Sequence, residues 1–300
     1  MKRTKTICII SVFFLVSIVL LCSITVPKVK PYNNQEPFET STVQLHNPKV
    51  KILSKAETDE LIEMDSDGYF ASLKQTDLDI RKTNSVKEYK STSKQQFCTG
   101  EIDDLVSKKL FHACEHVHYK LREHSQNTDY LFGISIESFL DIPWKFAIVC
   151  TEPGSEIQYE NGFPHTRGDV IILPKHIIDS YSTTNQTKLC KLLIHEKVHV
   201  YQKKYPDIIQ KFLSFNDFKK GDMRVSHQDP ANPDLNEFRY SHKKLGLMFA
   251  QYKNDKPKTF ADIQYAQQND SSSEHPLEYM AYRFEEIIDT PADQISLIKN

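Results

Sequence analysis

The most constraining feature of the chain is a His-Glu-x-x-His pentad at residues 195–199, set in the largely apolar run from Leu189 to Gln202. The leucine, isoleucine and valine residues of this run predict a helix that is mostly buried. Residues four apart lie on one face of a helix, so the rings of His195 and His199 can reach one point. Two histidines and Glu196 need polar partners in such a helix, and a metal ion between the imidazoles provides one.

The pentad also contains the residue types that zinc catalysis requires. Zinc lowers the pKa of a bound water toward roughly 7 and polarises a substrate carbonyl. A nearby carboxylate takes the proton of that water and passes it to the leaving group. Glu196 lies about 100° around the helix from His195, which suits this role better than that of a ligand. A core helix with hydrogen-bonded histidines is the competing interpretation. Lys197 is unusual here and is expected to face away from the metal.

The helix resembles the metal-binding helix of the zincin metallopeptidases. Metzincins need a glycine and a third histidine further along, and the matching positions hold Gln202 and Tyr205. The resemblance is therefore to the gluzincins, which take their third ligand from a glutamate on a later helix. It implies an α+β zincin-like domain with a small mixed sheet and one zinc ion per chain.

A second segment carries the same resemblance. Residues 275–281 read His-Pro-Leu-Glu-Tyr-Met-Ala, which is similar to the Pro-x-Glu-x-x-Ala signature of several gluzincin-like families. By that resemblance Glu278 is the third zinc ligand, and Glu274, His275, Glu237 and His227 remain alternatives. Thermolysin-like enzymes carry an aspartate four residues after the glutamate to orient a ligand histidine. Tyr282 occupies that position here, so other residues must support the ligands.

Substrate contacts are expected from two further segments. Residues 169–173 predict a strand just before the metal helix, where zincins place an edge strand that pairs with substrate. Residues 224–237 contain two Asx-Pro steps and predict a rigid turn before a hairpin. The candidates for contacting substrate or stabilising its oxyanion are Arg224, His227, Tyr282 and His165, with Tyr201 and Tyr279 as further possibilities.

The N-terminal part predicts a membrane anchor. Residues 7–26 contain no charged residue, and about 20 apolar residues can cross a bilayer. Lysine and arginine precede this run, which favours residues 1–6 as a cytoplasmic tail and a luminal or extracellular body. Secretion after signal cleavage is the alternative. Residues 27–95 are rich in polar residues and predict a stalk or linker, and residues 96–300 form the metallopeptidase-like domain.

The cysteine content and the net charge limit the disulfides and the binding partners that the chain can have. Four cysteines lie in the body, at positions 98, 114, 150 and 190, and three disulfide pairings are possible. The net charge of −2 gives no electrostatic basis for nucleic-acid binding. We expect a membrane-anchored zinc metallopeptidase that acts on peptides or proteins. A catalytically inactive zincin-fold binding module and a zinc hydrolase of a non-peptide amide are the alternatives. Substrate specificity and oligomeric state stay open.

Overall fold

The computed structural model describes residues 47–98, 102–125, 130–131, 134–151, 158–181, 186–224, 226–267 and 270–291. These residues form a mixed α/β structure with small sheets, as the α+β prediction required. No helix within these ranges is long and apolar enough to cross a membrane. The predicted tail, the predicted anchor at 7–26 and the first part of the predicted stalk lie outside them.

The main sheet has four strands in the order β1-β4-β6-β5. Strands β1 (Val50–Ile52), β4 (Trp144–Val149) and β6 (Val170–Pro174) are parallel, and β5 (His165–Arg167) pairs antiparallel with β6. The strand predicted at 169–173 is therefore present. Its predicted place at the edge of the sheet is wrong, because it lies between β4 and β5 and the edge strands are β1 and β5.

Two cores cover the two faces of this sheet. Phe146 and Ile148 of β4 join one apolar cluster, whereas Ala147 and Val149 join the other. Alternate residues of a strand point to opposite faces, and both faces are covered, so β4 and β6 read as continuous apolar runs. The sheet thus separates the N-terminal helices from the helical layer that carries residues 187–204.

The N-terminal layer contains α1 (Lys55–Met64), α2 (Tyr69–Ser72), α3 (Gln75–Ile80) and α4 (Val86–Gln96). The prediction of a stalk or linker up to residue 95 is wrong for this part. The helices are short and each buries only a few side chains, such as Ile62, Phe70 and Tyr89, so their composition is that of a polar linker. Those few residues pack on the sheet and bring the segment into the folded body.

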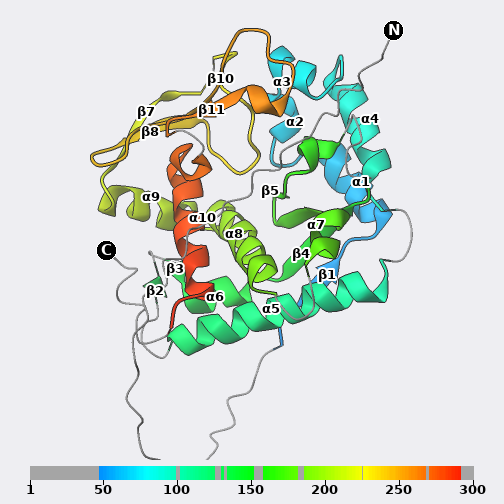
Figure 1. Ribbon diagram of the computed structural model, residues 1–300, viewed down its shortest axis with the longest axis vertical. Helices are drawn as coiled ribbons and strands as arrows, with labels where there is room; N and C mark the ends of the chain where they lie inside the picture. Colours follow the sequence, from blue (N-terminus) through cyan, green and yellow to red (C-terminus); the bar gives the residue numbers. More distant parts are fainter. Residues whose placement is uncertain are drawn as a thin grey trace, which may run out of the picture. The chain divides into compact units, whose positions relative to one another are not determined.

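The opposite layer holds the longer helices. In Figure 1, α8 (Thr187–Lys204) lies beside α10 (Pro276–Glu285), and α5 (Asp104–Ser125) packs against α8. The connecting elements on this side are α6 (Ile136–Asp141), α7 (Lys175–Ser180), α9 (Pro206–Phe215), the hairpin β2 (Tyr130–Leu131) with β3 (Ile134–Ser135), and the 3₁₀ turn η4 (Glu286–Ile288). The 3₁₀ turn η1 (Tyr159–Gly162) packs with the N-terminal layer.

A second, antiparallel sheet follows α9. It is formed by β7 (Phe218–Met223), β8 (Phe238–His242) and β9 (Gly246–Met248), and a separate hairpin joins β10 (Ala250–Tyr252) to β11 (Ile263–Tyr265). The turns η2 (Phe260–Asp262) and η3 (Ser271–Ser273) lead to α10.

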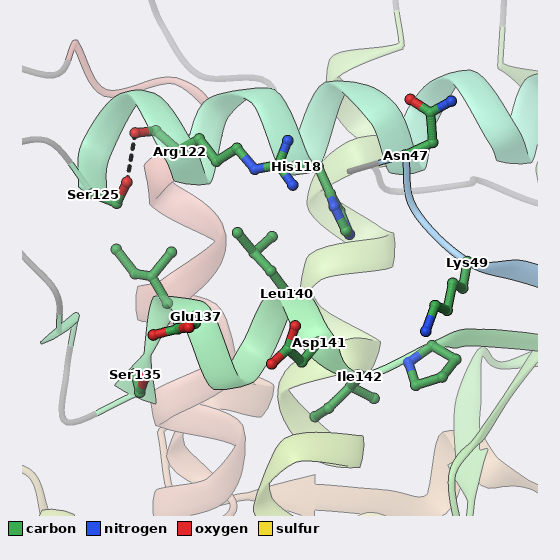
Figure 2. Close-up of a pocket in the computed structure, with 12 residues that line it drawn as sticks. Asn47, Lys49, His118, Arg122, Ser125, Ser135, Glu137, Leu140, Asp141 and Ile142 are labelled. Carbon is green, nitrogen blue, oxygen red and sulfur yellow. Dashed lines mark hydrogen bonds between the residues drawn. The ribbon is translucent and has the colours of Figure 1, made fainter. Parts of the chain in front are cut away.

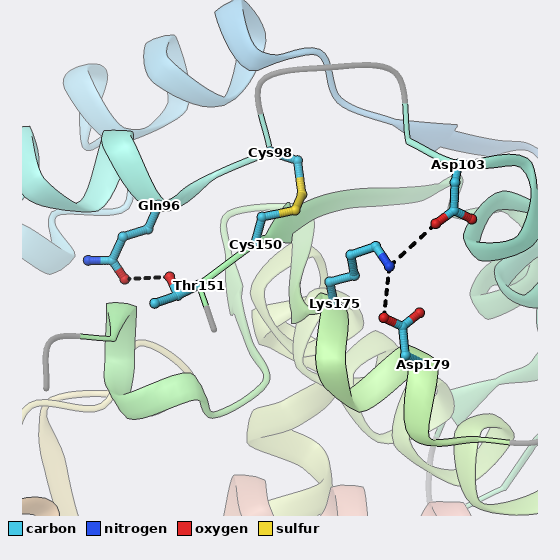
Figure 3. The surroundings of a disulfide bond; sticks show 7 residues. All are labelled: Gln96, Cys98, Asp103, Cys150, Thr151, Lys175 and Asp179. Carbon is cyan, nitrogen blue, oxygen red and sulfur yellow. Dashed lines mark hydrogen bonds and ion pairs between the residues drawn. A yellow bond between two sulfur atoms is a disulfide. The ribbon is translucent and has the colours of Figure 1, made fainter. Parts of the chain in front are cut away.

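A disulfide joins Cys98 to Cys150, so the structure forms one bridge of one of the three possible pairings and leaves the second bridge unformed (Figure 3). The backbone around it is paired as well: the Cys98 amide donates to the Ile148 carbonyl, and the Cys150 amide donates to the Gln96 carbonyl. Cys114 and Cys190 are free and buried. The bridge therefore fastens the end of the N-terminal layer to the central strand β4.

Replacing both bridged cysteines, Cys98→Ser with Cys150→Ser, should lower the free energy of unfolding by about 2–4 kcal/mol, because the unfolded chain regains the freedom of a long loop. The sequence separation is 52 residues. Urea unfolding of the full-length chain measures the effect. Reductant should bring the wild type to the same midpoint and leave the double variant unchanged. Equal midpoints for oxidised wild type and double variant would contradict a stabilising bridge.

A buried histidine predicts a pH dependence of stability. His118 of α5 accepts a hydrogen bond from the Trp144 indole at 3.0 Å. Burial, with smaller effects of Lys197 and Arg122, lowers the pKa of His118 from 6.5 to about 3. The unfolded chain then binds more protons than the folded chain between these values, so stability is lost as the pH falls below 6.5.

We expect the variant His118→Asn, which keeps an acceptor for Trp144, to lose less stability on acidification. The difference from wild type should be about 2 kcal/mol between pH 6.5 and 5. Urea unfolding of both proteins across this range is the measurement. Parallel pH profiles of the two proteins would show that His118 does not titrate abnormally.

Candidate metal centre

Three side chains from two helices meet at one point. Nε2 of His195 lies 3.2 Å from Nε2 of His199, both on α8. The carboxylate of Glu278, in the first turn of α10, lies 3.4 Å from His195 Nε2 and 3.5 Å from His199 Nε2. All three residues are buried, and their ligand atoms lie within 4.8 Å of one another. This group could hold a metal ion.

The spacing of the donors suits a small tetrahedral ion. Ligands about 2.0–2.1 Å from zinc in a tetrahedral arrangement are roughly 3.3 Å apart. The three observed distances are 3.2, 3.4 and 3.5 Å. Two imidazoles and one carboxylate are also a donor set that catalytic zinc sites use. The residues therefore fit the ion that the sequence predicts.

His199 is fixed by a residue one turn further along α8. Its Nδ1 donates to the side-chain oxygen of Gln202 at 2.9 Å, and the Gln202 amide donates to the Leu277 carbonyl at 3.0 Å. A proton on Nδ1 leaves Nε2 with its lone pair directed at the cluster. Burial lowers the pKa of His199, which also favours the neutral ring.

His195 has a different support. Its Nδ1 lies 3.6 Å from a carboxylate oxygen of Glu285, two turns after Glu278 on α10. The ring of Tyr282 packs edge-on against it, with centroids 4.6 Å apart. Burial disfavours the charged ring, but hydrogen bonds with Glu278 and Glu285 outweigh this and raise the pKa of His195. Glu285 thus lies against Nδ1 of His195, whereas Glu278 lies against Nε2 of the same ring.

Glu196 is buried beside the cluster. One of its carboxylate oxygens, Oε2, has no hydrogen-bond partner among the residues that the structure describes. Burial raises the pKa of Glu196, and the negative charge of Asp234 raises it further, while His195 opposes the shift. A carboxylate with an unpaired buried oxygen is costly unless water or substrate reaches it.

Asp234 belongs to the Asn-Pro-Asp turn at 232–234, for which the sequence left a substrate contact open without indicating its partners in the fold. Its carboxylate accepts from the Thr166 amide at 3.0 Å and lies 3.1 Å from the Lys203 ammonium. Thr166 belongs to the edge strand β5 and Lys203 to α8. Although burial raises it, the pKa of Asp234 is lowered by the charges of Lys203 and His199. Asp234 therefore joins the turn at 226–237 to both the edge strand and the metal helix.

Two alternatives for the third ligand have other roles. His275 caps α10: its Nδ1 accepts from the Leu277 amide at 3.1 Å, and its Nε2 lies 3.0 Å from the Asn236 side-chain oxygen. Glu274 lies 3.7 Å from the Arg224 guanidinium, and burial raises the pKa of Glu274 to about 7. Neither residue belongs to the cluster of donors, and nor does Glu237 or His227.

The candidates for substrate contact are only partly brought together. Tyr282 touches His195, and its hydroxyl bonds to Ser271 at 2.7 Å. Arg224 pairs with Glu274 and donates to the Pro230 carbonyl, and it does not contact the cluster of donors directly. His227 is exposed and pairs with Asp255. The remaining candidates lie in the surrounding structure: His165 is buried on β5, Tyr201 receives the Ser135 amide, and Tyr279 packs on Phe218.

Lys197 does face away from the cluster. Its ammonium donates to the Ile142 carbonyl at 2.7 Å and lies 3.9 Å from the centre of the Trp144 ring. Burial lowers the pKa of Lys197 to about 7. The charged residue that is unusual in the pentad thus binds the opposite side of the core.

Comparison with protein-family models, curated proteins and solved structures finds no match to this chain.

The position of Glu285 predicts an effect on metal affinity. Glu285→Ala should weaken Zn²⁺ binding by about 10- to 100-fold, because His195 loses the carboxylate that orients its ring. The matched control is Glu286→Ala, since Glu286 pairs with Arg283 on the surface. Competition with a coloured zinc chelator measures both. Equal affinities of the two variants would remove Glu285 from the metal centre.

Proposed function

We propose that the chain is a zinc-dependent metallopeptidase of the gluzincin-like type. The observation that carries this proposal is the convergence of His195, His199 and Glu278 at distances of 3.2–3.5 Å, in buried surroundings. The chain forms this convergence from segments about 80 residues apart, and the first of them carries a glutamate within the His-Glu-x-x-His pentad. A chance pentad on a core helix does not require a third donor at this point.

Three protein ligands would leave one coordination position of the zinc ion free for water or substrate. Zinc bound by three protein ligands keeps an open position, where it lowers the pKa of water and polarises a carbonyl. Glu278 reaches the site from the first turn of α10, where the helix dipole favours a negative charge. The two histidines lower the pKa of Glu278 against the effect of burial, so it is present as a carboxylate.

Glu196 is the proposed general base. It follows His195 directly, and its unpartnered oxygen is the buried acceptor that a reacting water needs. Its raised pKa suits a group that takes a proton from water and returns it to the leaving amine. Tyr282 and Arg224 are the candidates for stabilising the oxyanion, since Tyr282 contacts a ligand and Arg224 lies near the N-terminus of α10. His165 and His227 are weaker candidates.

The proposed setting is a single-pass membrane protein. Residues 7–26 anchor the chain, residues 1–6 are cytoplasmic, and the catalytic body lies on the luminal or extracellular side. A disulfide at Cys98–Cys150 is consistent with an oxidising compartment. The same bond would form in a protein secreted after signal cleavage.

The decisive experiment compares the full-length wild type with Glu196→Gln. We expect one zinc ion per chain in both proteins, with cleavage of a mixed peptide library reduced by about 10²- to 10⁴-fold in the variant, because the base is lost while the ligands remain. Metal analysis and mass spectrometry of the peptide products are the measurements. Full-length protein is needed because a chain starting at Cys98 would lack β1 and the four N-terminal helices.

Two further outcomes separate the alternatives. Glu278→Ala should abolish stoichiometric zinc binding, and retained zinc would overturn its assignment as a ligand. Zinc in the wild type without peptide cleavage would favour an inactive binding module. Hydrolysis of acylated amines without peptide cleavage would favour a non-peptide amidase. Absence of zinc from the wild type would reduce the pentad to part of a core helix.

A further inference from the structure

A second cavity lies away from the metal centre. It has a volume of about 730 Å³, within the range of small-molecule sites. Its walls come from the segment before β1, from α5 and from α6 with the residues just after it, and α8 and α10 contribute no lining residue (Figure 2). The cavity is therefore distinct from the proposed catalytic site.

The cavity is lined by charges of both signs. Glu137 and Asp141 are four apart on α6, so their carboxylates lie on one face of that helix. Lys49, just before β1, also lines the cavity (Figure 2). Within the described part of the chain, none of these three side chains forms a hydrogen bond or ion pair. Opposite charges thus face one space without neutralising each other.

The α5 wall adds two nitrogen-bearing side chains. Arg122 lies one turn after His118, and both line the cavity. His118 is only 5% exposed, and its Nε2 accepts from Trp144, so the proton of the neutral ring is on Nδ1. That buried N–H has no acceptor among the residues described. A buried donor without a partner is costly, and an acceptor oxygen nearby would relieve it.

The charge pattern selects the class of ligand. A simple anion would be attracted by Lys49 but repelled by the two carboxylates of α6, and a simple cation would be attracted by the carboxylates but repelled by Lys49. A molecule with an ammonium at one end and a carboxylate at the other suits both walls. Leu140 and Ile142 line the same space and could accept an aliphatic side chain.

We propose that this cavity binds a free amino acid or a short unblocked peptide, with its ammonium toward Glu137 and Asp141 and its carboxylate toward Lys49 and the unpartnered N–H of His118. The inference depends on the charges of the cavity and not on the proposed metal chemistry. Lys49, Glu137 and Asp141 are exposed, so each contact contributes little alone. Binding therefore requires both ends of the ligand together.

The test is calorimetric titration of the full-length chain after removal of metal with EDTA, so that no peptide is cleaved. The probes are leucine and leucyl-leucine, each beside its N-acetylated form, which lacks the ammonium, and its C-terminal amide, which lacks the carboxylate. We expect the unblocked ligands to bind and each blocked form to bind about fivefold more weakly. The tighter of leucine and leucyl-leucine identifies the preferred length.

Two variants make a crossed control. Glu137→Gln with Asp141→Asn should weaken binding of the unblocked ligand and the amide by about tenfold, and leave the acetylated ligand unchanged. Lys49→Gln should weaken the unblocked and acetylated ligands and leave the amide unchanged. All these positions are exposed, so both proteins should keep the wild-type melting temperature.

Three results would overturn the proposal: no binding of either unblocked ligand at millimolar concentration, inorganic phosphate binding as tightly as leucyl-leucine, or binding that is lost in His199→Ala but unaffected by the cavity variants. Because metal is absent throughout, none of these results depends on whether the chain is a peptidase.

Discussion

The structure depends on satisfying the polar groups of one helix that is buried on all sides. Along α8, the five consecutive residues from His195 to His199 are at most 8% exposed. Four of them have polar or ionisable side chains: two histidines, a glutamate and a lysine. Unpaired polar groups in such surroundings cost several kcal/mol, roughly 2–7 each in an apolar medium. The elements around α8 therefore each supply a partner for one of its buried polar side chains. The Ile142 carbonyl accepts from Lys197 and the Trp144 ring of β4 lies against its ammonium. Gln202 of α8 accepts from His199, and carboxylates of α10 lie against both nitrogens of His195.

This requirement explains the placement of α10. The helix must bring Glu278 to the cluster in its first turn and Glu285 to the far side of His195 two turns later, so it has to lie alongside α8. Ala281, fully buried between these two positions, allows the close approach. His275 fixes the start of the helix by capping it, and Pro276 occupies the first helical turn. In the sequence His-Pro-x-Glu-x-x-Ala, the histidine and proline thus start the helix, the glutamate reaches the cluster, and the alanine allows the helix to pack against α8.

The sequence predicted the parts that helical spacing determines and missed those that depend on distant contacts. The helix that carries the pentad and the strand before it follow from local pattern, whereas Glu278 was assigned by its resemblance to the gluzincin-like signature. Glu285 and Gln202 could have been found by helical spacing, at seven residues from Glu278 and three from His199. The N-terminal helices were missed because each buries too few residues to show a period. The disulfide and Asp234 join segments far apart in the chain, and no local pattern indicates such pairs.

Asp234 also limits how a substrate could approach. On β5, an edge strand of the main sheet, the Thr166 amide donates to Asp234 instead of facing solvent. Lys203 of α8 neutralises the same carboxylate, so edge strand, turn and metal helix are joined by one buried charge pair. Lys203 also donates to the Thr166 carbonyl, and the Gly168 amide just after β5 donates to Asp67. A peptide adding to β5 would therefore have to displace Asp234, which would leave the Lys203 ammonium without its carboxylate partner.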